Sequence, residues 1–292
     1  MSARSYLHVP EGWERTTTHS VGPFVTEETL RGPDGSVVTW HSRSRRKGRK
    51  PDDRTGSGWW QPRRMSWWIA VLFAIGATCF LVAAVACQVS SSPGSWTLPV
   101  FFIGSIFFTS AGYCQFSQAV NVPHDPMPGT PRQRFRPVSW EPGRIDWLAS
   151  SIQLAGTIFF NVSTFLAMQK GLDTTEINRR VWAPDALGSI CFLLASELAF
   201  AEVCHRWFAL QWRSLSWWIV ALNMAGSIAF GIAAVASLIE PSTSEPVSAA
   251  IANIGTALGA LGFLVGAVLL IPESMRSAEG EAPVAEPAVP AG

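Results

Sequence analysis

Five polar side chains stand inside long apolar segments of this 292-residue chain, and they are the residue types that could do chemistry there. Polar groups within a membrane are costly, so they are rare and commonly functional. Carboxylates and amides in such a setting can carry protons or cations, or can hydrogen-bond one helix to another. The five residues are Gln153, Asn161, Asp185, Glu197 and Asn223.

The depths of these side chains predict a polar cluster around Glu197. Gln153 and Asn223 each lie six residues past the tryptophan that opens their segment, and Glu197 reaches a similar depth in a segment running the opposite way. Asp185 and Asn161 are expected nearer the outer side, where they could form a second pair. Glu197 would meet the others only if its helix is sandwiched between neighbours, because it points to the other helix face. Interhelical hydrogen bonding is the alternative role.

The sequence contains no motif for catalysis or for metal binding. It has no glycine-rich phosphate loop, no His-x-Glu pair and no serine nucleophile motif. Cys204 and His205 follow Glu202 closely, but adjacent residues do not have the spacing of metal ligands. We therefore expect no enzyme activity, no cofactor and no metal site.

Low charge and long apolar runs predict an all-α integral membrane protein. Charged residues make up 15% of the chain, against about 25% in an ordinary soluble domain. Six apolar segments are each long enough to cross a hydrocarbon core of about 30 Å. Together they form an expected six-helix transmembrane domain over residues 65–272. The segments cover about 67–88, 98–119, 147–169, 182–203, 217–239 and 248–271.

Polar regions flank the apolar domain on both sides. Residues 1–64 are polar and basic, and within them FVTEETLR and SVVTWHSR flank the turn sequence GPDG, which indicates a β-hairpin. The flanks are too short for an independent core, so we expect a small appendage or partial disorder. Residues 273–292 are rich in Ala, Pro and Glu, which predicts a disordered tail.

The basic residues predict the orientation in the membrane. Arg residues occupy the second-to-third and fourth-to-fifth connections, whereas the first-to-second and fifth-to-sixth connections contain no Lys or Arg. Because cytoplasmic loops are enriched in these residues, both termini are expected in the cytoplasm. The third-to-fourth connection, with Lys170, Arg179 and Arg180, is an exception. We accept it because five other segments agree.

A run of nine basic residues lies at 43–64, directly before the first segment. Basic residues beside a membrane span attract anionic lipid headgroups by about 1 kcal/mol each. We therefore expect the partner of this stretch to be the bilayer surface and not nucleic acid. A homo-oligomer or another membrane protein is left open as a further partner.

One phrase occurs twice in the chain. SWWIAVLFAIGATCFLVAAVA at 66–86 and SWWIVALNMAGSIAFGIAAVA at 216–236 share eleven of 21 positions. Aligning them exposes a shorter pattern, Gly-x-x-x-Phe, in all six segments. This spacing puts both residues on one helix face, where Gly admits a neighbouring backbone and Phe fills the space beside it. The predicted packing ridge consists of Gly76, Phe80, Gly104, Phe108, Gly156, Phe160, Gly188, Phe192, Gly226, Phe230, Gly259 and Phe263.

Odd-numbered segments resemble one another more than even-numbered ones, which indicates three repeated helical hairpins. Paired spans with this ridge resemble the YrhK-like membrane protein family, as do WLASSIQLAGTIFFNVSTF at 147–165 and VWAPDALGSICFLLASELAFAE at 181–202. The resemblance covers residues 65–271. It implies a multi-pass bacterial inner-membrane protein and carries no established activity. The sequence thus favours a non-enzymatic scaffold, sensor or accessory role. The alternative is a transporter or channel for a small ion or solute that uses the polar cluster.

Overall fold

The computed structural model describes residues 9, 11–43, 59–90, 94–122 and 134–276. Six helices in it are long and apolar enough to cross a membrane, so the prediction of a mostly helical protein with six candidate spans is confirmed. Their ends differ from the expected ones by a few residues. The helices are α2 (Met65–Val89), α3 (Thr97–Val120), α4 (Ile145–Leu166), α6 (Ala183–Cys204), α7 (Leu215–Ala236) and α8 (Ala249–Arg276).

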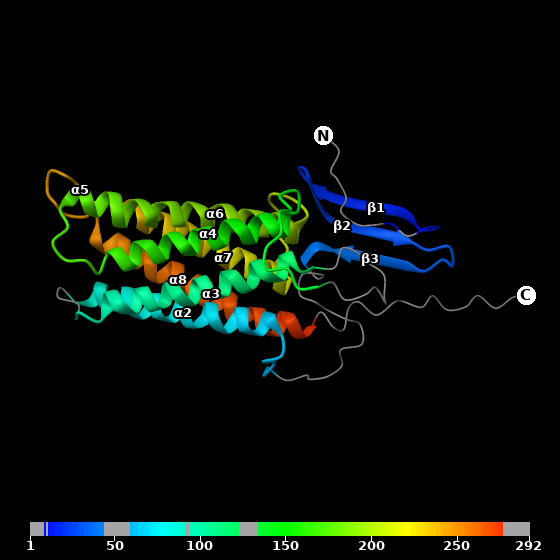
Figure 1. Ribbon diagram of the computed structural model, residues 1–292, viewed down its shortest axis with the longest axis horizontal. Helices are drawn as coiled ribbons and strands as arrows, with labels where there is room; N and C mark the ends of the chain where they lie inside the picture. Colours follow the sequence, from blue (N-terminus) through cyan, green and yellow to red (C-terminus); the bar gives the residue numbers. More distant parts are fainter. Residues whose placement is uncertain (1–8, 10, 44–58, 91–93, 123–133, 277–292) are drawn as a thin grey trace, which may run out of the picture.

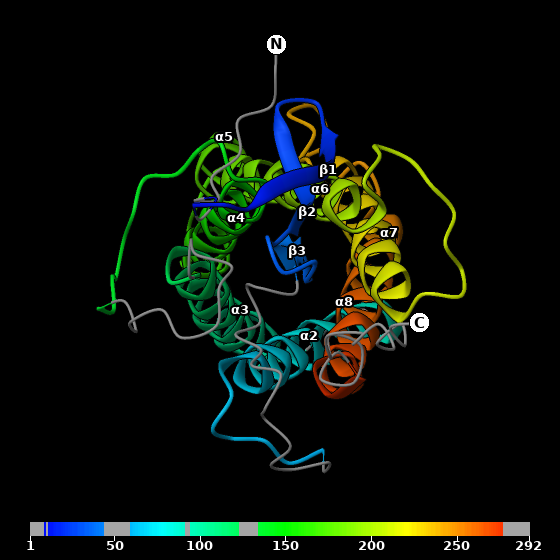
Figure 2. The same cartoon turned by 90° about the vertical axis from the view of Figure 1, so that its right-hand side faces the viewer.

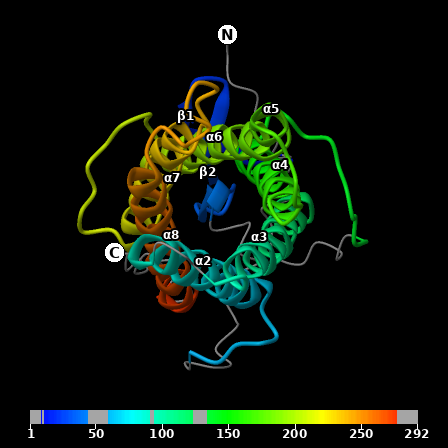
Figure 3. The same ribbon diagram turned by 90° about the vertical axis from the view of Figure 1, so that its left-hand side faces the viewer.

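The six helices stand side by side in a closed ring, seen end-on in Figures 2 and 3. Each helix packs against the next in chain order, and α8 returns to α2. Neighbours along the chain run in opposite directions, as in other up-and-down helical bundles. The large aliphatic side chains that remain exposed include Ile103, Ile158, Ile190 and Ile228. A ring with such a surface fits a hydrocarbon environment, where helices satisfy their own backbone groups.

The fourth candidate span begins earlier than expected. It runs from Thr174 to Cys204, because the short helix α5 (Thr174–Ile177) and a π-helical turn (Asn178–Trp182) lead without a break into α6. Asp173 starts this helix with a capping box in which its side chain accepts from the Glu176 backbone. Such caps satisfy amide groups that have no partner in the first helical turn.

A small antiparallel sheet precedes the ring. The strands are β1 (Glu14–Val21), β2 (Phe24–Arg31) and β3 (Val37–His41), with β2 in the middle. The expected hairpin is present as β2 and β3. Strand β1 was not predicted, because all of its residues except Val21 are exposed and it has no alternating apolar pattern.

The sheet and the C-terminal end of α8 lie at the same end of the ring, on the right in Figure 1. We call this end the sheet end and the other the far end. The sheet has its own bulges and little core, but it packs on the bundle. Val21 and Phe24 contact Ile145 of α4 and Ala201 of α6. The bundle therefore supplies the apolar partner that the short strands lack.

The C-terminal boundary differs from the expected one. A disordered tail was expected from residue 273, but α8 continues through Pro272 to Arg276. Glu273 and Ser274 are buried there. The carboxylate of Glu273 accepts from Arg43 and from Ser216, and the Ser274 hydroxyl donates to the carbonyl of Ile271. These contacts hold the last helical turn. The remaining expected tail, 277–292, lies outside the described residues.

The phenylalanines of the ridge meet on the axis of the ring. Those from the helices that start at the sheet end, Phe80, Phe160 and Phe230, form a triangle with centroid separations of 5.9–6.3 Å. Those from the antiparallel partner helices form a second triangle with separations of 5.4–6.3 Å. All six rings are at most 5% exposed and belong to one core cluster. The members of the second triangle are Phe108, Phe192 and Phe263.

The glycines of the ridge lie where the two helices of a hairpin approach most closely. A Cβ atom added to Gly76 would stand 2.9 Å from the carbonyl oxygen of Gly104. The corresponding distance is 3.1 Å for Gly156 against Gly188, and 2.9 Å for Gly226 against the carbonyl of Gly259. Real Cβ atoms essentially never stand closer than 3.0 Å to such atoms, so the approaches at Gly76 and Gly226 require glycine. At Gly156 the same conclusion follows from the Cβ atom of Cys191, which would be 2.9 Å away.

At the sheet end, tryptophan side chains hydrogen-bond the first helix of each hairpin to the chain segment that precedes it. The indole nitrogens of Trp67, Trp147 and Trp217 each donate to a backbone carbonyl eight residues earlier, at distances of 2.8–3.0 Å. The first helix of every hairpin is therefore tied to the chain segment that enters it. Exposed aromatic side chains accompany these ties, including Trp60 and Trp140. Such amphipathic rings are typical of a membrane–water interface.

Candidate functional site

Two of the predicted polar side chains form hydrogen bonds between α3 and α4. The carbonyl oxygen of Gln153 accepts from the side-chain amide of Gln115, at 3.3 Å. The carbonyl oxygen of Asn161 accepts from the Ser105 hydroxyl at 2.6 Å, and its amide donates to Thr109. Both amides therefore join neighbouring helices of different hairpins.

The other three predicted residues lie elsewhere. Asn223 lies against α8, where a Cβ atom on Gly266 would stand 2.6 Å from the Asn223 amide oxygen. Glu197 and Asp185 are half-buried on α6. Within the described residues, no hydrogen bond or ion pair joins any two of the five predicted side chains. The structure thus distributes them over separate contacts.

A denser group of chemically active side chains gathers at the junction between the sheet and the ring. Just after β3, the Ser42 hydroxyl donates to Glu202 of α6 at 2.6 Å. The next residue, Arg43, donates through Nε and Nη2 to Glu273 of α8, at 3.0 and 3.3 Å. Ser216 of α7 donates to the same carboxylate. Two helices, α6 and α8, therefore bind the end of the sheet, and α7 hydrogen-bonds the carboxylate that Arg43 contacts.

Charge complementarity stabilises this junction. Arg43 is 14% exposed and Glu273 is 5% exposed. Burial by itself lowers the pKa of the Arg43 guanidinium, but Glu273 and Glu202 raise it by more, so its pKa lies above the ordinary value. Arg43 belongs to the basic stretch for which we expected lipid contact, yet its partner here is a carboxylate. Residues 44–58 of that stretch lie outside the described residues.

Histidines and one glutamate form a second titratable group at the junction. Glu27 is the register partner of His19 on β1 and of His41 on β3, so the three residues cross the sheet in one row. Paired residues of antiparallel strands point to the same face. This face is turned towards His205 at the end of α6.

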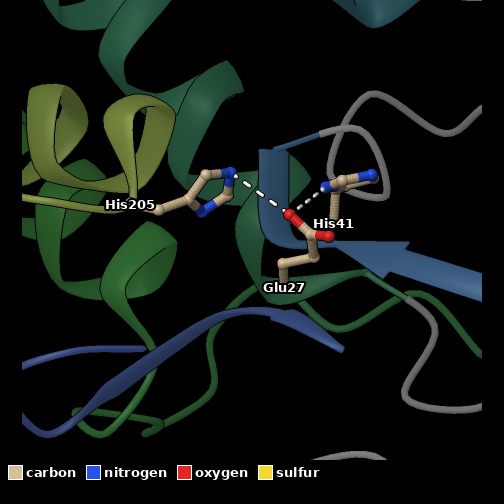
Figure 4. Close-up of side chains that lie close together, drawn as sticks. All are labelled: Glu27, His41 and His205. Atoms are coloured by element: carbon tan, nitrogen blue, oxygen red, sulfur yellow. Dashed lines mark ion pairs between the residues drawn. The ribbon is translucent and has the colours of Figure 1, made fainter. Parts of the chain in front are cut away.

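Figure 4 shows His41 and His205 on either side of Glu27. A single carboxylate oxygen, Oε2 of Glu27, lies 3.4 Å from Nδ1 of His41 and 3.4 Å from Nε2 of His205. One ligand atom from each residue lies within 4.8 Å of the other two. The side chains are between 20% and 38% exposed, so ions from the aqueous phase can reach them.

The backbone and a hydroxyl orient His205. It ends α6 in the left-handed region, with φ 53°, which turns the chain and its side chain towards the sheet. Its Nδ1 lies 2.8 Å from the hydroxyl of Thr26, and that hydroxyl donates to the carbonyl of His19. Burial lowers the pKa of His205, an effect opposed by Glu27 and assisted by His41 and His19.

From the sequence, His205 lacks the spacing of a metal ligand and His41 was expected in a loop, while Glu27 had no predicted role. Thr26 and His205 are 179 residues apart, so no local spacing could indicate their contact. The available signal was the strand pattern, because Glu27 and His41 are placed opposite each other by the predicted hairpin. The contribution of α6 required the packing of the sheet on the ring.

Comparison with protein-family models, with curated proteins and with solved structures found no match to this chain. The interpretation of the site therefore rests on its own geometry.

Proposed function

We propose that this chain is a multi-pass protein of the bacterial inner membrane that has no catalytic chemistry and acts as a scaffold, sensor or accessory subunit. The six apolar helices support a membrane location. The distribution of Arg, and the position of the sheet and of the end of α8 on one side of the ring, support two cytoplasmic termini.

The filled centre of the ring is the observation that carries this proposal. Two stacked triangles of phenylalanine occupy the axis near the middle of the helices, and all six rings are buried. A conduction path along the axis would have to displace them. Of the predicted polar residues, Gln153 and Asn161 hydrogen-bond neighbouring helices, which is the role that such amides have in membrane bundles.

The docked sheet favours a sensor or scaffold over an inert bundle. Its last strand leads directly into Ser42 and Arg43, whose partners lie on α6 and α8. A change in the sheet would therefore be transmitted to helices on two sides of the ring. The resemblance to the YrhK-like family is retained as a proposal about the three hairpins, and so is lipid contact by the basic stretch.

Flux measurements separate this role from transport. Purified protein in liposomes should show no more proton, Na⁺ or K⁺ flux than empty liposomes, and Glu197→Gln should match the wild type. A flux present in the wild type and abolished by Glu197→Gln, with folding intact, would establish the alternative of a transporter that uses Glu197.

Reporter fusions test the orientation. Fusions after residues 175 and 243, at the far end of the ring, should report the periplasmic side, and a fusion after residue 210 should report the cytoplasm. A cytoplasmic signal at 243 would contradict the arrangement of three hairpins with both termini inside.

A further inference from the structure

We propose that Glu27, His41 and His205 form a binding site for a divalent transition-metal ion, with Zn²⁺ the best match, that fastens the sheet to the bundle. This assignment goes beyond the membrane role proposed above and does not depend on it. Two ligands come from adjacent strands, β2 and β3, and the third comes from the end of α6.

The distances between the donor atoms fit a tetrahedral zinc site. Zinc binds nitrogen and carboxylate oxygen at about 2.0–2.2 Å, so two ligand atoms of one tetrahedron lie about 3.3–3.6 Å apart. Both distances from Oε2 of Glu27, to His41 Nδ1 and to His205 Nε2, are 3.4 Å. The separation of the two imidazole nitrogens, at most 4.8 Å, leaves only a small approach to complete the geometry.

The hydrogen bonds of Thr26 determine which nitrogen of His205 can bind a metal. Nδ1 of His205 lies 2.8 Å from the hydroxyl of Thr26, and this contact holds the ring so that Nε2 is the nitrogen that faces Glu27. In the tautomer in which Nδ1 donates to the hydroxyl, Nε2 carries the lone pair that a metal needs. This is the arrangement in which a second group holds a metal-binding imidazole in one tautomer and one orientation.

Nε2 of His205 and Nδ1 of His41 face the same carboxylate oxygen of Glu27, each at 3.4 Å. One divalent ion placed among the three atoms would contact all of them, whereas a proton can join only one imidazole to the carboxylate.

The groups around the site can supply the fourth ligand and additional negative charge. A tetrahedral site with three protein ligands leaves one position for water or a further side chain. His19 is the neighbouring imidazole, with its ring centroid 5.9 Å from that of His205. The carboxylate of Glu202 is buried close by and adds a negative potential that attracts a cation.

Metal binding to the full-length protein without a polyhistidine tag tests the assignment. Equilibrium dialysis in detergent should yield one Zn²⁺ per chain, and Co²⁺ should give the absorption of a tetrahedral site. Glu27→Gln, His41→Ala and His205→Ala should each weaken Zn²⁺ binding by about 100-fold or more. Thr26→Val, which removes the orienting hydroxyl, should weaken it by about 10–100-fold. Glu14→Gln, on exposed β1, is the control and should bind as the wild type does.

His41→Cys keeps the test decisive if a ligand deletion unfolds the sheet. Cys provides a thiolate near the position of Nδ1, so this variant should still bind Co²⁺ and should gain a thiolate-to-cobalt charge-transfer band. The assignment is overturned if the wild type binds no Zn²⁺, or if the three ligand variants bind as tightly as the wild type. Co²⁺ binding to His41→Cys without the thiolate band would also overturn it.

Discussion

The centre of the ring and its sheet end are built from opposite kinds of contact. At the centre, six phenylalanines and three glycine pairs provide the contacts, and they contain no polar side-chain atom. At the sheet end, carboxylates, imidazoles and a guanidinium provide them. Lipid offers helices no hydrophobic reason to associate, so close backbone approach and shape must hold the centre. The sheet end borders water, where charged groups can be paired selectively and exchange ions.

The difference predicts that the two regions respond to different substitutions. Changes of volume should damage the centre and spare the junction. Substitutions that remove a charge at the junction should detach the sheet from the bundle and leave the bundle folded.

The largest effect is expected at the Phe triangles. Phe192→Ala removes a ring that is 1% exposed and lies 5.0 Å from Phe160 between centroids. We expect a loss of about 3 kcal/mol of unfolding free energy, the lower end for this change, because the unfolded side chain would contact lipid and not water. Steric-trap or denaturant unfolding in detergent measures it. Phe165→Ala, at a ring that is 51% exposed, is the matched control and should cost far less.

A smaller loss of stability is expected at the glycine contacts, and it should depend on which glycine of a helix is replaced. In Gly226→Ala, the new methyl group would stand 2.9 Å from the carbonyl of Gly259 and from the ring of Phe263. Overpacking of this kind costs about 1–3 kcal/mol. Gly231→Ala in the same helix meets only a flexible Leu193 methyl group at 3.4 Å and should be neutral or stabilising. Equal stability of the two variants would show that the hairpins tolerate separation.

The third prediction concerns the junction. Arg43→Met should cost about 1.5 kcal/mol of docking energy, since it removes charged hydrogen bonds to Glu273 and leaves that carboxylate buried. Amide hydrogen exchange in β1–β3 should accelerate while exchange in α2–α8 stays slow. Arg31→Met, the same change at an exposed strand end, should have no effect. Loss of protection throughout the bundle would contradict the separation of the two regions.

The smallest effect is expected at the amide pair between α3 and α4. Gln153→Leu should cost about 0.6 kcal/mol, the average of an interhelical hydrogen bond in a membrane. A double-mutant cycle with Gln115→Leu isolates this contact. A coupling energy of zero would show that the two amides do not support each other.

Several features followed from the sequence because they depend on near neighbours in the chain. Apolar length determined the six helices, and the Gly-x-x-x-Phe spacing placed both residues on one face of each helix. The turn sequence GPDG, flanked by alternating residues, determined the β2–β3 hairpin. The first strand was missed because its exposed residues carry no such pattern.

The pairing of groups distant in the chain was decided only by the tertiary structure. Depth along a helix placed Gln153, Glu197 and Asn223 at one level, and their helices α4, α6 and α7 are neighbours in the ring, but Gln153 faces α3 and Asn223 faces α8, away from α6. The docking of the sheet on the ring brought His205 to Glu27 and His41, and Arg43 to Glu273. Sequence periodicity specifies which face of a helix is apolar, whereas a side chain's partner depends on how whole elements pack against one another.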